Sequence, residues 1–147
     1  KLAVGRNHQC GSATDSAAYC WGSNDQGQLG DTTTGHIARG PVTGGLKFVD
    51  IAAGYRFTCG VVAGSGDAYC WGANGNGVLG HIGPSSNVPL RIPGNVAFSQ
   101  ITTGELHACA LSVAGKVYCW GGNASGQLGD GTAVDRVSPT LVIGQQP

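Results

Sequence analysis

The sequence holds no methionine, few charged residues and few aromatic ones. Charged side chains make up 11% of its 147 residues, and aromatic side chains 7%. The eight basic and eight acidic residues cancel, so no basic stripe is available to bind nucleic-acid phosphates. No apolar run has the length of a membrane span. We therefore expect no nucleic-acid partner and no membrane span, and the missing methionine leads us to expect a processed or excised chain.

Patterns that carry catalysis or bind a metal are missing as well. The few carboxylates show no paired spacing suited to general acid–base work, and no serine stands in a Gly-x-Ser-x-Gly turn. The glycine-rich turns at 75–77 and 129–131 lack the Lys-Ser/Thr pair of a phosphate loop. The acidic turns lack the alternating residues and closing glutamate of a calcium loop. We expect a non-enzymatic protein without a cofactor.

A repeat of about 50 residues dominates the sequence, a period typical of solenoids and propellers. Cys-Trp-Gly occurs at 20–22, 70–72 and 119–121, and its tryptophans are the only ones in the chain. Short β-branched and aromatic stretches bounded by glycine, such as 117–120, predict strands. No window has the 3.6-residue periodicity of a long helix. We predict an all-β unit, 1–147, with repeats at approximately 1–46, 47–96 and 97–147.

The repeat resembles that of the RCC1-like β-propeller family. Each copy reads Gly-x-x-His/Phe-x-Cys, then Tyr-Cys-Trp-Gly-x-Asn-x-x-Gly-x-Leu-Gly, then a polar loop and a proline. The resemblance covers essentially the whole chain. It implies four-stranded antiparallel blades around a central channel, with most members closing a ring of seven. The expected blade-core residues are Trp21, Trp71, Trp120, Leu29, Leu79 and Leu128.

Three blades are too few to close a ring, so we expect a partial propeller whose first and last faces need cover. Three explanations stay open. The chain is part of a longer propeller, or it self-assembles as a closed dimer ring or a head-to-tail filament, or it is a stable half-propeller. The sequence starts and stops at a repeat boundary, which leads us to expect a junction with another copy or with further repeats.

Six cysteines form three pairs, and the members of each pair lie on consecutive predicted strands of one hairpin. Facing positions on antiparallel strands suit a bridge, which favours Cys10–Cys20, Cys59–Cys70 and Cys109–Cys119. Reduced buried thiols remain an alternative. A zinc site with His8 or His107 is disfavoured because Phe57 fills the same position in the second repeat. Disulfides predict an extracellular, periplasmic or cell-surface location.

Positions that vary between repeats are the natural places for recognition, because loops on a rigid scaffold carry function. One set follows the leading glycine of each repeat, and if the blades stack as in the family it lines one mouth of the channel. The second set lies in the loops before each proline, at 34–39, 81–88 and 133–137. Ordinary variation of exposed loops is the alternative for both sets. The candidate partner-binding residues are Arg6, Asn7, Tyr55, Arg56, Glu105, Leu106, His36, Arg39, His81 and Arg136.

Three functional hypotheses follow. The first is an extracellular structural or protein-binding module that binds a protein partner or further blades, as a homo-oligomer or filament in its most specific form. The second is a secreted protein inhibitor, which the resemblance to RCC1-like β-lactamase inhibitors suggests. The third, a nucleotide-exchange or chromatin factor, is implied by the RCC1 protein itself and is disfavoured by the neutral charge and the cysteines.

Overall fold

The computed structural model describes residues 1–33 and 35–145, except for the side chains of 35–37. These residues form three four-stranded antiparallel sheets, each built from four consecutive strands. The first sheet holds β1 Leu2–Val4, β2 His8–Ser12, β3 Ala18–Ser23 and β4 Gly35–Pro41. The second holds β5 Phe48–Ala53, β6 Phe57–Val62, β7 Ala68–Gly72 and β8 Ser86–Arg91. The third holds β9 Phe98–Thr103, β10 His107–Ser112, β11 Val117–Gly121 and β12 Arg136–Leu141.

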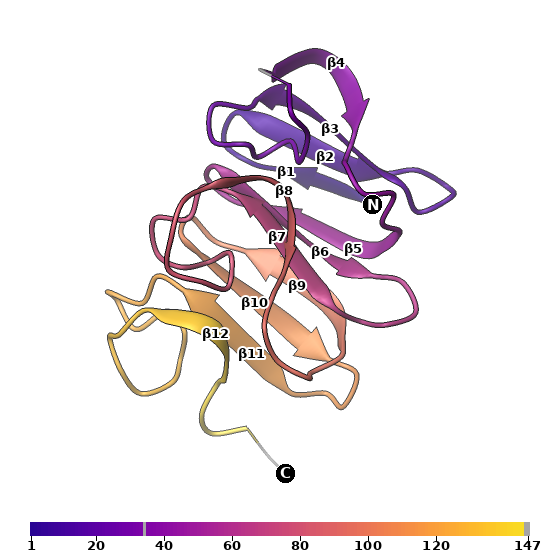
Figure 1. The fold of residues 1–147 in the computed structure, drawn as a ribbon. Coiled ribbons are helices and arrows are strands. Elements are labelled where there is room, and N and C mark those ends of the chain that lie inside the picture. Colours follow the sequence, from indigo (N-terminus) through magenta and orange to yellow (C-terminus); the bar gives the residue numbers. More distant parts are fainter. Residues whose placement is uncertain (34, 146–147) are drawn as a thin grey trace.

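The sheets stack in sequence order as three propeller blades (Figure 1). The leading strand of each blade contacts the leading strand of the next, β1 with β5 and β5 with β9. Backbone bonds also join the blades, because the amides of Phe48 and Phe98 donate to the carbonyls of Ser16 and Gly66, each at 2.8 Å. The hairpin turn of one blade thereby fixes the start of the next.

The glycine after each tryptophan serves a bend in the third strand of its blade. Gly22, Gly72 and Gly121 have φ of 106°, 104° and 100°, and the pairing register shifts there in every blade, as at a β-bulge. A Cβ at Gly72 would lie 2.5 Å from the Arg56 carbonyl oxygen. The same oxygen accepts a bond from the Ala73 amide at 2.9 Å. The bulge therefore lets the loop after the leading glycine, here Gly54, pack closely against the third strand.

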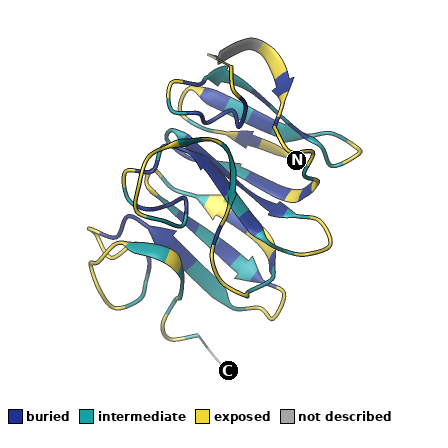
Figure 2. Cartoon of the chain, in the orientation of Figure 1, coloured by how far each residue is buried: buried dark blue, intermediate teal, exposed yellow. Residues whose placement is uncertain are grey.

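Two hydrophobic cores fill the spaces between blades, one between the first and second and one between the second and third. Buried residues are found in the strands and in the turns around Leu29 and Leu79, whereas the hairpin turns and the loops before the outer strands are mostly exposed (Figure 2). Trp71 and Trp120 are fully buried in these cores, as expected. Trp21 departs from the expectation and is only half-buried, because none of the three described blades covers the side of the first sheet on which it lies.

The cysteines pair as the repeat predicted: Cys10 with Cys20, Cys59 with Cys70 and Cys109 with Cys119. Each pair occupies directly facing positions of the second and third strands of its blade. Within the described residues no cysteine is free. The bridges thus cross-link each blade within itself and leave the joints between blades to packing and hydrogen bonds.

The loops before the prolines are shorter than we predicted. Arg39 and Arg136 lie in the outer strands β4 and β12 and not in loops. The outer strands β4, β8 and β12 also include the prolines of the repeat, Pro41, Pro89 and Pro139. Proline is tolerated there because an edge strand leaves one row of amides unpaired, and the polar composition of such an edge imitates a loop in the sequence.

Candidate functional site

The asparagine of each turn is a structural hub. Asn24, Asn74 and Asn123 each accept a bond, at 2.9 Å, from the amide of the leucine five residues later. Their amide nitrogens donate to the loop that follows, as Asn74 does to the carbonyls of His81 at 3.0 Å and Gly83 at 3.2 Å. These side chains hold the turn against the loop on the face that carries the candidate site.

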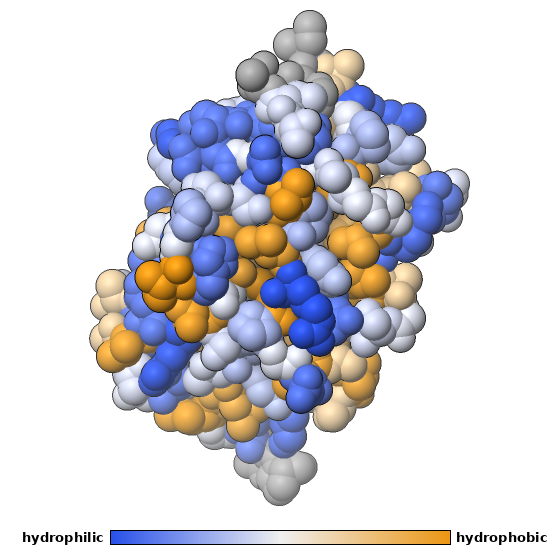
Figure 3. Space-filling view, viewed as in Figure 1, coloured by the Kyte–Doolittle hydropathy of each residue, from blue (hydrophilic) through white to orange (hydrophobic). Residues whose placement is uncertain are grey.

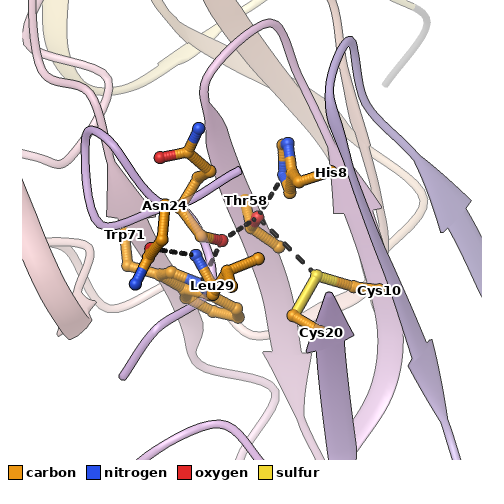
Figure 4. The surroundings of a disulfide bond; sticks show 8 residues. His8, Cys10, Cys20, Asn24, Leu29, Thr58 and Trp71 are labelled. Atoms are coloured by element: carbon orange, nitrogen blue, oxygen red, sulfur yellow. Dashed lines mark hydrogen bonds between the residues drawn. A yellow bond between two sulfur atoms is a disulfide. The ribbon is translucent and has the colours of Figure 1, made fainter. Parts of the chain in front are cut away.

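A buried hydrogen-bond relay joins the first blade to the second (Figure 4). The Trp71 Nε1–H donates to the Gln28 carbonyl at 3.0 Å, and the Thr58 hydroxyl donates to the same oxygen at 2.8 Å. The Thr58 proton is thereby used, so His8 Nε2 is the donor in its 2.8 Å bond to Thr58 Oγ1. The relay runs beside the Cys10–Cys20 bridge, whose Cys10 sulfur lies 3.9 Å from Thr58 Oγ1.

Burial lowers the pKa of His8 from 6.5 to about 4, against the smaller opposing attraction of the Asp25 carboxylate and a bond to the Phe57 backbone. Its Nδ1 is buried without a hydrogen-bond partner. The imidazole is therefore neutral near pH 7, which fits a role in the joint between blades.

The loops after the leading glycines of the first two blades meet around one tyrosine. The Arg6 guanidinium lies over the Tyr55 ring, 4.5 Å from its centroid, and donates a hydrogen bond to the Tyr55 hydroxyl. Arg56 lies 5.5 Å from the same centroid and forms an ion pair with Asp25 at 3.2 Å. The pKa of Asp25 is lowered, above all by the hydrogen bond from the Gln28 side chain. A hydrogen bond from Ser23 and the positive charge of Arg56 lower it further.

A cavity of about 440 Å³ opens beside this cluster, between the second and third blades. It brings together Tyr55, Arg56, Glu105 and Leu106, four residues of the first predicted set. It also includes residues that the sequence reasoning missed, Phe57, Asn76 and Val78 among them. Asn76 and Val78 stand out only when the turns of the three repeats are compared position by position. Arg6 and Asn7 lie on the same side, one blade earlier.

The second predicted set does not come together. Arg39 lies over the Tyr19 ring of its own blade, 4.8 Å from the centroid. Arg136 pairs with Asp130 at 2.6 Å, and this bond, after that of Thr132, helps to lower the pKa of the Asp130 carboxyl. His81 lies over its own turn beside Asn74. The side chain of His36 is outside the described residues.

Two models of the regulator of chromosome condensation (RCC1) repeat match the chain, one at residues 15–61, 65–111 and 114–146, the other at 1–28, 48–78 and 98–127. The chain belongs to the RCC1 repeat family. No curated protein sequence matches it. The RCC1 assignment accounts for both the repeat and the stacked blades.

Several solved structures are similar to this chain in fold. Yeast RCC1 (Prp20), solved bound to Kap60, matches with a TM-score of 0.84 and 21% identity over 97% of this chain and 36% of its own. Human WBSCR16 matches with a TM-score of 0.82 and 24% identity over 97% of this chain and 39% of its own. The ectodomain of the Physcomitrella patens receptor kinase CR4 matches with a TM-score of 0.59 and 26% identity over 89% of this chain and 31% of its own. The chain thus spans well under half the length of each.

The two outer faces of the RCC1 blades expose residues that are covered inside the stack. Leu2 is 65% exposed, whereas Ile51 and Ile101, at the same position of the next blades, are 1% and 4% exposed. At the opposite end Cys109 is half-buried, whereas Cys10 and Cys59 are fully buried. Figure 3 shows apolar side chains gathered in groups between polar ones on one face of the whole molecule.

Neither a metal centre nor a membrane helix is found in the described part of the chain. No three His, Cys, Asp or Glu side chains of residues 1–33 and 35–145 are grouped to hold a metal ion. The same residues include no helix with the length and hydrophobicity of a membrane span. What the RCC1 blades offer is a rigid frame, a loop cavity and two outer faces.

Proposed function

We propose that the chain is a non-enzymatic structural and protein-binding module that acts outside the cytosol, in the periplasm, outside the cell or on its surface. The observation that carries the proposal is that Leu2 is exposed and Trp21 only half-buried on one outer face, where the same positions are buried between inner blades. At the two inner joints such a face is covered by the neighbouring blade, and we infer a blade as the partner of the outer face as well. The partner blades come from another copy of this chain or from further repeats of the same protein.

The disulfides support the proposed compartment. Three cross-links in a chain of this size form and persist in oxidising surroundings and are rare in the cytosol. The similarity to the CR4 receptor-kinase ectodomain supports the same location, because the part of that protein that resembles this chain lies in an ectodomain.

The test is the native mass of the non-reduced chain, measured by light scattering over a series of concentrations. A discrete dimer supports a closed ring, and a mass that grows with concentration supports a head-to-tail filament. Leu2→Glu should abolish either form by charging the outer face, whereas Ile82→Glu, at an exposed position in the β7–β8 loop of the middle blade, should not. A monomer at every concentration would overturn self-assembly and assign the faces to further repeats.

The second candidate is a soluble protein inhibitor that binds through its loop face, and the cavity beside Tyr55 favours it. The test adds the purified chain to class A β-lactamases and follows substrate hydrolysis. Inhibition that Tyr55→Ala relieves would support this function, and unchanged hydrolysis across the panel would remove it.

A further inference from the structure

The turn of the second blade lacks a glutamine that closes the same turn in the other two blades. In the first blade Gln28 Oε1 accepts a bond from the Gln26 amide, and Gln28 Nε2 donates to Asp25, both at 2.9 Å. In the third blade Gln127 Oε1 accepts a bond from the Ser125 amide at 2.9 Å. Val78 occupies this position in the second blade and is unable to make either bond.

Three further polar positions are replaced at the same place. Phe57 stands where the other blades have a histidine, and Gly75 stands where the first blade has Asp25. Leu106 stands where the second blade has Arg56, so the Arg56–Asp25 ion pair has no counterpart at the next joint. The joint between the second and third blades is therefore apolar where the preceding joint is polar.

These replacements leave a cavity with an apolar floor. Val78 and Phe57 are buried, and Leu106, which is 46% exposed, forms one wall. A Cβ built on Gly122 would lie 3.3 Å from Leu106 Cβ and 3.4 Å from Asn76 Cγ, so these two side chains flank the same glycine. A volume of about 440 Å³ is in the range of cavities that enclose a small ligand or a side chain.

The rim of the cavity carries an acidic charge that is not neutralised. Within the described residues Glu105 makes no ion pair and no side-chain hydrogen bond. Asp135 lies on the same side and accepts a bond from Asn76 Nδ2 at 2.9 Å, which is the largest cause of its lowered pKa. The Arg56 charge across the cavity is already paired with Asp25.

We propose that this cavity binds an apolar side chain from a loop of a partner protein, followed by a lysine or arginine that pairs with Glu105. The floor supplies the burial of the apolar group, and the rim selects the basic neighbour by charge complementarity. The inference rests on the proposed protein-binding function and names the chemistry of its partner. The outer faces of the stack take no part in it.

The probe is a blocked hexapeptide, acetyl-Gly-Ser-Phe-Lys-Ser-Gly-amide, titrated into the ¹⁵N-labelled full chain with NMR as the readout. We expect shifts confined to residues 73–78 and 105–106 and to the Trp120 indole N–H, which donates to the Val78 carbonyl at 2.9 Å. Replacing Phe by Ala in the peptide should weaken binding about tenfold or more, since an aromatic side chain is no longer buried. Replacing Lys by Glu should weaken it about two- to fivefold, the effect of an exposed ion pair.

Matched variants fill or open the cavity. Val78→Gln with Gly75→Asp restores the turn of the first blade, and Gly75 has no atom within 4 Å of a built Cβ to oppose the change. This variant should lose peptide binding and keep the Trp120 indole signal of the folded joint. Leu106→Ala, at an exposed position, should weaken binding without a risk to folding, and Glu105→Gln should remove only the preference for Lys over Glu.

Three results would overturn the inference. The first is no shift at a peptide concentration of about 5 mM, well above the Kd of a weak complex. The second is equal binding by the cavity-filled variant. The third is a change of the same resonances with protein concentration alone, which would assign the cavity to a second copy. None of these results alters the light-scattering test, because Leu2 and the outer faces lie elsewhere.

Discussion

His8 gives the sharpest test of how the blades are joined. It is fully buried between the first two blades and donates to Thr58, and its Nδ1 has no partner. At the next joint Phe57 and Ala108 occupy the same two positions. The double substitution His8→Phe with Thr58→Ala therefore replaces a polar pair with an apolar pair that this chain already uses. The Gln28 carbonyl keeps its bond from Trp71.

The magnitude follows from the pKa of His8, which burial lowers from 6.5 to about 4. Between these values the unfolded chain binds a proton that the folded chain does not, so the free energy of unfolding rises with pH. The contribution of neutral His8 to stability is therefore fully present above pH 6.5 and is lost as the pH falls toward 4. The loss is about 3 kcal/mol at pH 4, at about 1.4 kcal/mol for each pKa unit.

The assay is urea unfolding of the non-reduced chain at several pH values between 7.5 and 4. The wild type should lose about 3 kcal/mol over this range, and the double variant should lose much less. His107→Phe is the control, because its imidazole is only half-buried and desolvation lowers its pKa less severely. Parallel curves for wild type and double variant would refute the reasoning, since the loss would then come from other groups.

Three further predictions concern the frame. Trp71→Phe should cost about 1–3 kcal/mol in urea unfolding because a buried bond is lost, whereas Trp21→Phe, at the same repeat position, should cost less than about 0.5 kcal/mol; equal costs would contradict the burial contrast. Under limiting reductant, mass spectrometry with thiol labelling should find Cys109–Cys119 opening first, because Cys109 is half-buried and the other two bridges are fully buried. Asn74→Ala should lower the stability by about 2–4 kcal/mol through the loss of its turn and loop bonds, and an unchanged unfolding midpoint would disprove its role as a hub.

The blades and their cross-links were predictable because they rest on features that recur at a fixed period. The paired cysteines and the tryptophan occur at the same positions in all three repeats. A wrong strand assignment in one repeat would therefore disagree with the other two. The strand pairs confirm this, since Cys10, Cys59 and Cys109 each face the partner that the repeat gave them.

The loops could not be predicted in the same way. Arg39 and Arg136 were placed in loops because an edge strand with proline has no hydrophobic alternation to mark it. The exposure of Trp21 was missed because burial depends on the neighbouring blade and not on the repeat in which the residue lies. The cavity depends on the combination of Val78, Gly75 and Leu106, which lie on two blades and meet only when the blades stack.

The two inner joints of this chain differ in chemistry, and that difference constrains what fits the outer faces. The first joint is polar, with His8 bonded to Thr58 and Arg56 paired with Asp25. The second is apolar and includes Phe57, Ala108 and Leu106.

The outer faces return to the polar type. The third blade offers His107 and Gln127 at the positions of His8 and Gln28, and the first blade offers Gln9 at the position of Thr58. The side-chain oxygen of Gln9 is able to accept a hydrogen bond as Thr58 does from His8. The side-chain NH₂ group of Gln9 is able to donate one as the Thr58 hydroxyl does to the Gln28 backbone carbonyl. A blade that carries a Gln, Thr or Ser at this position therefore suits the third blade, and one that carries an Ala there leaves the His107 donor unpaired at a cost of about 1–3 kcal/mol.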